Sequence, residues 1–204
     1  MAPTALLVTS NRHKLEEARA ILAPLGVRLR GRSRRLPEPQ ADTLEEVARA
    51  KLRSLGAIRG PVLVEDSGLF LEGLHGFPGV YSAYAFRTLG LDGLLRALAD
   101  RPREARFRTV VGLRNGSRIH LFAGELAGRI SREPRGSGGF GFDPIFEPRG
   151  GSRTLAELPP GTKNRISHRG LAFRAAARRL GGTSGELRPG PPGLAPRRRR
   201  SATH

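Results

Sequence analysis

Residues 107–125, FRTVVGLRNGSRIHLFAGE, decide the fold class, because they contain two apolar runs separated by turn-forming residues. The runs 107–113 and 118–125 are rich in Val, Leu, Ile and Phe, and Asn115-Gly116 lies between them. Asn-Gly is favoured in two-residue hairpin turns, because both central positions take a positive φ. The stretch therefore predicts two antiparallel strands.

Outward from this hairpin, strand-like and helix-like patterns alternate along the chain. Apolar positions three and four apart predict helices, and short apolar runs bounded by turn formers predict strands. The predicted strands are 4–9, 61–64 and 143–146; the predicted helices are 11–22, 43–55, 88–98 and 166–180; a Gly-rich stretch occupies 66–79 and a loop 130–141. Early alternation of strands and helices followed by a hairpin predicts an α/β fold with a mixed sheet.

The composition of the 204-residue chain, which has no cysteine, excludes several classes of protein. Without cysteine there is no disulfide framework, thiolate nucleophile or cysteine zinc site, so oxygen or imidazole must hold any metal. The apolar run 5–8 is too short to cross a membrane, and no basic stretch precedes it. We therefore expect a cytoplasmic protein that does not associate with a membrane.

The chain is strongly basic, with 36 Lys and Arg against 18 Asp and Glu. The tail 181–204 is rich in Gly, Pro and Arg, and we expect it to be disordered. The remaining domain, 1–180, is itself basic, which suits a polyanion such as a nucleoside triphosphate. Only three lysines persist among the arginines, and each marks either a site that needs a compact ammonium or a chance surface position. They are Lys14, Lys51 and Lys163.

A first polar cluster, Thr9-Ser10-Asn11 with Lys14, lies where the first strand meets the first helix. Backbone N–H groups at a helix start, together with a hydroxyl, an amide and a lysine, can bind phosphates. The alternative is an ordinary Ser or Asn helix cap beside a solvated lysine, and capping preferences favour it for this cluster taken alone.

A second cluster, Glu65-Asp66-Ser67-Gly68, follows the apolar strand 61–64. Two carboxylates at a strand end can hold a hard cation and orient a water. If the strand continues, the two side chains point to opposite faces, and we expect only one to face the site. The alternative is an Asx turn. Glu46 is a candidate second metal ligand, or else a surface or capping acid.

Two further clusters lie in the C-terminal half. In residues 138–144, GGFGFDP, glycines let a flat ligand approach the backbone, Phe140 can stack on a base, and Asp143 can accept from a base N–H. The alternative is a Phe that packs in the core. Lys163 and Ser167-His168-Arg169-Gly170 gather donors before the last helix, where the histidine is either structural or titrating.

Together these motifs resemble those of the inosine triphosphate pyrophosphatase family, whose members hydrolyse dITP, ITP and XTP to the monophosphate and pyrophosphate. The matching stretches are TSNRHK (9–14), TLEE (43–46), EDSGLFLEGLHGFPGVYSA (65–83), GFGFDPIF (139–146) and TLAELPPGTKNRISHRG (154–170). They occur in the family's order over about residues 4–180, and five separate motifs in order are far more specific than any one.

The resemblance implies an elongated mixed sheet flanked by helices, with two lobes and an active-site cleft between them, and a homodimer. It implies that Asp66 is the catalytic proton acceptor and that Glu46 and Asp66 bind Mg²⁺. The substrate-binding residues that it implies are Thr9, Ser10, Asn11, Lys14, Ser67, Phe140, Gly141, Phe142, Asp143, Lys163, His168 and Arg169.

The chain also departs from the family pattern at three positions. Glu65 stands where many bacterial members have Asp, Val47 where many have Asn, and Phe142 where many have Tyr.

Two other functions stay open at this point. One is a basic protein that binds nucleic acid without catalysis, although the acidic pair Glu65-Asp66 would repel a polyanion unless a divalent ion intervened. The other is a pyrophosphatase that acts on modified pyrimidine nucleotides.

Overall fold

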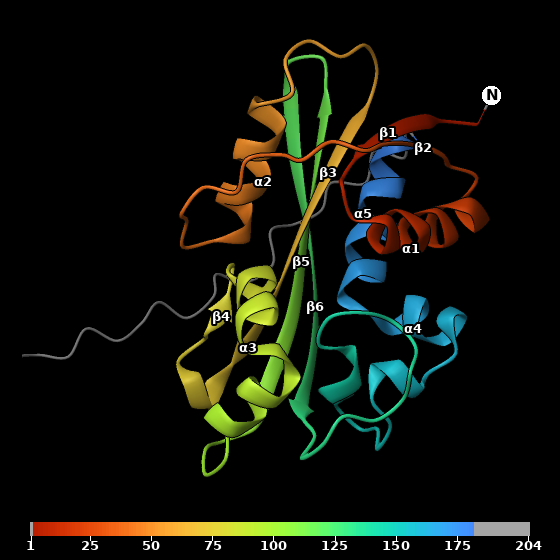
Figure 1. Cartoon of the computed structure of the whole chain (residues 1–204). Coiled ribbons are helices and arrows are strands. Elements are labelled where there is room, and N and C mark those ends of the chain that lie inside the picture. Colours follow the sequence, from red (N-terminus) through yellow and green to blue (C-terminus); the bar gives the residue numbers. More distant parts are fainter. Residues whose placement is uncertain (1, 182–204) are drawn as a thin grey trace, which may run out of the picture.

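The computed structural model describes residues 2–181 of the chain (Figure 1). Residue 1 and residues 182–204 lie outside the described part. The prediction that the tail is disordered therefore concerns residues that the structure does not describe. Within residues 2–181, no helix has both the length and the apolar character needed to cross a bilayer.

One seven-stranded sheet runs through this part of the chain, in the order β2-β1-β3-β5-β6-β7 with β4 paired to β3. β1 (Thr4–Val8) is parallel to β2 (Arg28–Arg32) and β3 (Val62–Leu71), whereas the antiparallel strands are β4 (Pro78–Gly79), β5 (Glu104–Asn115), β6 (Arg118–Ile130) and β7 (Phe146–Pro148). The predicted mixed sheet is confirmed.

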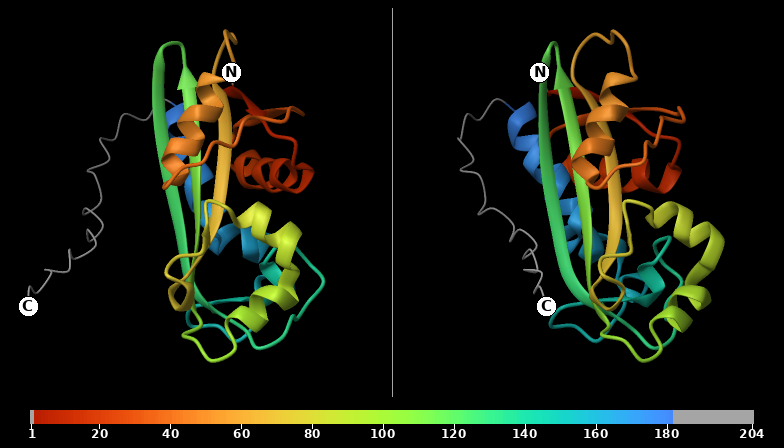
Figure 2. Two further views of the ribbon diagram at one scale, coloured as in Figure 1. Left: turned by 60° about the vertical axis from the view of Figure 1, so that its left-hand side comes forward. Right: turned by 90° about the vertical axis from the view of Figure 1, so that its left-hand side faces the viewer.

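Helices cover both faces of this sheet. They are α1 (Arg12–Leu22), α2 (Leu44–Arg53), α3 (Ser82–Ala97), α4 (Pro160–Ile166) and α5 (His168–Leu180), with short 3₁₀ turns η1 (Ala23–Leu25), η2 (Glu72–Leu74), η3 (Asp143–Ile145) and η4 (Leu155–Glu157). Figures 1 and 2 show β5 and β6 running the length of the molecule, with α2 on one side of the sheet and α1 and α5 on the other. The β5–β6 hairpin therefore spans the whole length of an elongated fold.

The alternation of side chains along β3 separates two of the three apolar cores. Leu63 packs with α1 and α5, and its neighbours Val62 and Val64 pack with α2. A third core, at the other end of β3, joins Leu69 and Leu71 to α3, η3 and η4. Because successive residues of a strand point to opposite faces, this pattern fixes the side of the sheet on which each acid beyond Val64 lies.

β3 is much longer than the predicted strand 61–64. Asp66, Ser67 and Gly68 favour turns locally, but β3 pairs with β5 without interruption from Val62↔Arg114 to Leu71↔Ala105. The continuous ladder outweighs the local preference, so the Asx turn that was the alternative for this cluster does not form. Gly68 is needed because a Cβ there would collide with the Gly79 carbonyl oxygen on β4.

The boundaries of other elements also differ from the sequence prediction. The two residues that close the β5–β6 hairpin are Gly116 and Ser117, one position later than expected, with Gly116 at φ 60°. α3 starts at Ser82 rather than 88 and breaks at Gly90, where φ is 63°. The predicted last helix, 166–180, is α5 and begins at His168 with Ser167 as its N-cap, and α4 before it was not predicted. The predicted strand 143–146 is η3 followed by β7, and β2 was not predicted, because Arg alternates with Leu29 and Gly31 there.

Candidate active site

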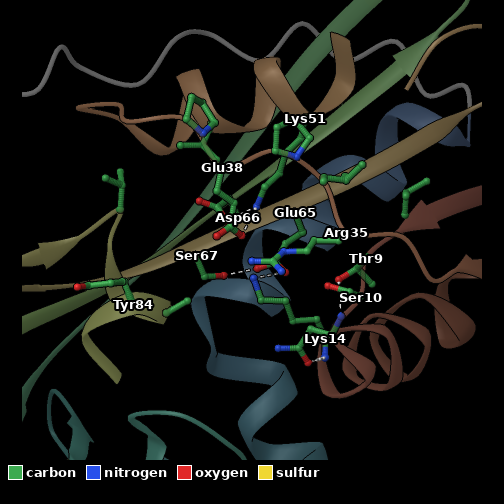
Figure 3. A pocket seen from close by; sticks show the side chains of 18 of the residues that line it. Thr9, Ser10, Lys14, Arg35, Glu38, Lys51, Glu65, Asp66, Ser67 and Tyr84 are labelled. Atoms are coloured by element: carbon green, nitrogen blue, oxygen red, sulfur yellow. Dashed lines mark hydrogen bonds and ion pairs between the residues drawn. The ribbon is translucent and has the colours of Figure 1, made fainter. Parts of the chain in front are cut away.

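A cavity of about 880 Å³ opens beside the middle of β3 (Figure 3). One side is formed by the β1–α1 turn, the loop before α2 and α2 itself, and the other by α3 and the two residues that precede it, Val80 and Tyr81. This volume is within the range of small-molecule binding sites and is large enough for a nucleotide. Its placement agrees with the cleft that the resemblance implies.

The β1–α1 turn supplies Thr9, Ser10, Asn11 and Lys14 to this cavity. Asn11 is the N-cap of α1, because its Oδ1 accepts from the backbone N–H of Lys14 at 3.2 Å, and Thr9 Oγ1 accepts from the N–H of Asn11 at 3.1 Å. The cap is therefore real, but Lys14 is not a solvated lysine. Its Nζ lies 3.1 Å from Glu65 Oε2, and its side chain is 17% exposed.

Glu65 and Asp66 point to opposite faces of β3, yet both border the cavity. Glu65 faces α1 and α5, where Arg169 Nη2 lies 3.2 Å from its Oε1, and the Ser67 hydroxyl donates to the same oxygen. Burial by itself raises the pKa of Glu65, but the charges of Arg169 and Lys14 hold that pKa well below its usual value. Glu65 is therefore a fixed anion.

On the other face, Asp66 pairs with Lys51 of α2, whose Nζ lies 2.6 Å from Oδ1. Glu38 Oε1 is a weaker second partner of Lys51, at 3.4 Å. Burial would lower the pKa of Lys51, but Asp66, Glu38 and Glu65 together raise it, so Lys51 stays charged. Figure 3 shows Lys51 and Lys14 approaching β3 from opposite sides.

Glu46 serves as a helix cap, which was the alternative role for this acid. Its Oε2 accepts from the backbone N–H groups of Asp42 and Thr43, completing a capping box at the start of α2. Its side chain lines a smaller neighbouring hollow, which shares Pro39 and Tyr81 with the main cavity. Asp66 lines the main cavity and Glu46 the smaller hollow, so the two carboxylates do not line the same cavity. Within residues 2–181 no three His, Asp or Glu side chains form a group that could hold a metal ion.

The two acids nevertheless fit a hard cation in the chemistry of their donors. Asp66 is bonded only through Oδ1 and Glu46 only through Oε2, so each keeps one carboxylate oxygen without a hydrogen bond to any residue in the range 2–181. Carboxylate oxygens are the ligands that Mg²⁺ prefers, together with waters and phosphate oxygens.

The predicted base-binding residues form a second cluster next to the cavity. Asp143 Oδ2 accepts from Lys163 Nζ at 2.6 Å and from the Phe140 backbone N–H at 2.7 Å. Lys163 Nζ and Arg169 Cζ each lie 5.2 Å from the centre of the Phe140 ring. The glycine loop permits this arrangement, because a Cβ on Gly139, at φ 70°, would collide with the Asp143 carboxylate.

Two other expected substrate-binding side chains lie within the packed interior. Phe142 is 4% exposed and packs in the core, with its ring edge-on to Phe86 at 5.3 Å. His168 is 2% exposed and stacks on Phe107 at 4.5 Å. Burial and the charge of Arg169 place the pKa of His168 well below its ordinary value, so this histidine is neutral. Gly141 takes φ 63° in the loop between Phe140 and Phe142.

Several residues of the site carried no assignment in the sequence. Glu17 of α1 joins the two base-side cations, since Oε1 lies 2.6 Å from Lys163 Nζ and Oε2 lies 2.7 Å from Arg169 Nη1. Its position one turn after Lys14 was the available signal. Lys51 stood out only as a retained lysine. Other cavity-lining charges had no signal, because arginine is so common in this chain and Glu38 lies in a loop; they are Arg34, Arg35, Glu38 and Arg87.

The chain is similar to several known proteins. A family model described as the Ham1 family matches residues 5–179. A dITP/XTP pyrophosphatase of Thermococcus kodakarensis is 52% identical over 172 residues, covering 83% of this chain and 93% of that protein, and one of Hyperthermus butylicus is 43% identical over 181 residues, covering 88% and 95%. Among solved structures, the Ham1 protein of Staphylococcus aureus has a TM-score of 0.72 at 28% identity, over 87% of this chain and 98% of that one. A nucleoside-triphosphatase, dITP/XTP pyrophosphatase, of Mycobacterium abscessus has a TM-score of 0.63 at 34% identity, over 85% and 98%.

Proposed function

Since the chain belongs to the Ham1 family, we propose that it hydrolyses the non-standard purine nucleoside triphosphates dITP, ITP and XTP to the nucleoside monophosphate and pyrophosphate. One observation carries the proposal. A cavity lined by Lys14, Lys51 and Asp66 lies against a cluster of Phe140, Lys163 and Arg169, so phosphate-binding and base-binding groups are adjacent.

The cations at the cavity neutralise the charge of a triphosphate, which any attack on the α-phosphorus requires. Asp66 orients the attacking water and accepts its proton. The new bond forms between the water oxygen and the α-phosphorus, and the bond from that phosphorus to the α,β-bridging oxygen breaks, releasing pyrophosphate. Burial raises the pKa of Asp66 although the charge of Lys51 opposes the shift, so the carboxylate can accept the proton of the water as well as orient it.

We propose Mg²⁺ as the cofactor, held by Asp66 and Glu46 through the oxygens that their present bonds leave open. When bound, it shields phosphate oxygens and lowers the pKa of a coordinated water. For Glu46 this role requires the side chain to reach from its helix cap toward the cavity, past the Pro39 and Tyr81 that border both hollows.

Selectivity arises at the purine 6-position, where inosine and xanthosine present an oxygen acceptor and adenosine presents an amino donor. The cationic donors of Lys163 and Arg169 pair with the oxygen and stay unpaired against the amino group. In the structure both donors are occupied by Glu17, Asp143 and Glu65, so a base must take over hydrogen bonds that these acids now accept.

We also propose a homodimer that acts in the cytoplasm, where its nucleotide substrates occur. Exposed large apolar side chains next to β4 and on α3 support an interface there: Phe77, which precedes β4, is 43% exposed, and Phe86 and Leu89 of α3 are 37% and 42% exposed. Light scattering coupled to size exclusion distinguishes a dimer from a monomer, and a monomer at micromolar concentration would contradict the proposal.

A panel of nucleoside triphosphates assayed for pyrophosphate release with and without Mg²⁺ tests the function. We expect magnesium-dependent release from ITP, dITP and XTP at kcat/KM values far above those for ATP. Equal kcat/KM for ATP and ITP contradicts the base-pocket argument, and preferred turnover of a modified pyrimidine triphosphate favours that alternative. Salt-sensitive DNA binding without any hydrolysis favours a nucleic-acid-binding protein.

A further inference from the structure

Six charged side chains form one continuous chain of ion pairs between the base-side cluster and the cavity. In order they are Asp143, Lys163, Glu17, Arg169, Glu65 and Lys14, and the sign of the charge alternates at every step. The five contact distances are 2.6, 2.6, 2.7, 3.2 and 3.1 Å. The base-reading cations and the phosphate-side lysine are therefore linked by direct contacts alone.

Glu65 is the single link between the two halves of this chain. Its Oε1 faces Arg169 and its Oε2 faces Lys14, so one carboxylate holds a cation from α5 and a cation from α1. Its side chain is 1% exposed, so solvent cannot take over either contact. Within the described residues Glu65 is the only acid within ion-pair distance of Lys14.

The carboxylate is itself held in place from the sheet. The Ser67 hydroxyl donates to Oε1, lies 2.7 Å from Thr109 Oγ1 on β5, and accepts from Arg169 Nη2 at 3.1 Å. β3 fixes the backbone of both residues through its ladder with β5, in which Glu65 pairs with Val111 and Ser67 with Thr109. A carboxylate fixed on a rigid strand can position two cationic side chains at once.

We propose that Glu65 is a positioning residue that couples recognition of the purine to the seating of the triphosphate, by holding Arg169 and Lys14 through one carboxylate. This proposal rests on the proposed function, because that function assigns base recognition to Arg169 and phosphate binding to Lys14. Glu65 touches neither the base nor the phosphates and acts through its two partners. A base that draws on Arg169 and a phosphate that draws on Lys14 each compete with the Glu65 carboxylate for one of its two cations, so each site senses the occupation of the other.

Two separate measurements test this coupling. The first is the ratio of kcat/KM for ITP over ATP, which reports the base pocket. The second is the inhibition constant of inorganic triphosphate, which reports the phosphate side alone. For Glu65→Gln we expect the ratio to fall about tenfold and the inhibition constant to rise about tenfold, within the usual range of coupling between sites. Glu65→Asp keeps the charge and should recover both in part.

Matched variants separate coupling from a general loss of structure. Glu17→Gln removes an acid that contacts only the base-side cations, and we expect it to lower the ratio while changing the inhibition constant by less than about twofold. Glu16→Gln removes an exposed acid one residue away, paired only with Arg12, and should change neither measurement. If Glu65→Gln leaves the ITP/ATP ratio unchanged, or if Glu17→Gln and Glu65→Gln raise the inhibition constant equally, the proposal is overturned.

Lys14→Gln keeps the proposal testable if Glu65→Gln does not fold. Within residues 2–181 the Lys14 ammonium forms no hydrogen bond or ion pair with a base-side residue and is linked to them through Glu65, so an independent phosphate site predicts no change in base preference. Coupling predicts that the ITP/ATP ratio falls about threefold or more, because an Arg169 held by an unshared carboxylate donates less readily to the base. An unchanged ratio in Lys14→Gln overturns the coupling. If the unmodified chain does not hydrolyse ITP, it is the proposed function that fails instead.

Discussion

Asp66→Asn tests the catalytic role of Asp66 together with its structural role. The substitution keeps the shape of the side chain and removes its charge, 2.6 Å from Lys51 Nζ on a position that is 7% exposed. Turnover of ITP should fall on the order of 10²-fold or more, the range for loss of a general base. That factor corresponds to about 2.7 kcal/mol of transition-state stabilisation.

The same substitution should also lower stability, because the Lys51 side chain is only 7% exposed and loses its main partner. Removing one partner of a buried pair costs about 3–5 kcal/mol. Glu38 remains 3.4 Å from Nζ, which places the expected cost near the lower value, about 3 kcal/mol. For a chain of this size that is a drop of about 6–12 °C in Tm.

A second substitution separates the two effects. Asp66→Asn combined with Lys51→Met removes the unpaired ammonium, so thermal unfolding followed by circular dichroism should recover most of the lost Tm while turnover stays low. Glu38→Gln, which removes the weaker partner on a side chain that is 62% exposed, should shift Tm by less than about 2 °C. Near-normal turnover in Asp66→Asn would remove Asp66 from its catalytic role, and recovered turnover in the double variant would make its role purely structural.

Three further predictions concern metal, backbone and pH. Chelation with EDTA should abolish pyrophosphate release from ITP, and excess Mg²⁺ should restore it; release that persists after exhaustive chelation would contradict metal dependence. Gly139→Ala should lower Tm by several degrees, because φ is 70° and the new methyl collides with Asp143, whereas Gly161→Ala, which meets open space, should be neutral or stabilising. The folded-state pKa of His168 is depressed, so its stability contribution is present above the unfolded value near pH 6.5 and is lost as the pH falls below it. His168→Phe should therefore reduce the acid-induced loss of stability by up to about 1.4 kcal/mol per pH unit between pH 6 and 5, measured by urea unfolding, and an unchanged slope would show that the histidine already protonates in the folded state.

The sequence predicted those parts of the fold whose signals are local. The turn of the β5–β6 hairpin, predicted to within one residue, the N-cap of α1 at Asn11 and the capping box of Thr43 and Glu46 each depend on residues within four positions of one another. The extent of β3 could not be predicted, because the strand conformation of Ser67 and Gly68 is imposed by β5 and β4, which follow much later in the chain.

The candidate site divides in the same way. Lys14 and Arg169 meet on Glu65, and Asp143 is linked to Arg169 through Lys163 and Glu17. The family resemblance related the motifs that contain Lys14, Arg169 and Asp143, whereas no local pattern did. Glu17 could not be identified, since its two partners, Lys163 and Arg169, are 146 and 152 residues away and appear only when α1 packs against α4 and α5.

The opposite orientation of Glu65 and Asp66 on β3 limits how the length of this protein can change. Inserting one residue between Val62 and Glu65 would exchange the sides of the two carboxylates, sending one toward the lysine of α2 that now meets the other. Indels in this strand should therefore be absent from working homologues and fatal in engineered ones. The turn at Gly116 and Ser117 lies at one end of the long β5–β6 hairpin and could accept a peptide tag or a fluorescent fusion without disturbing either acid.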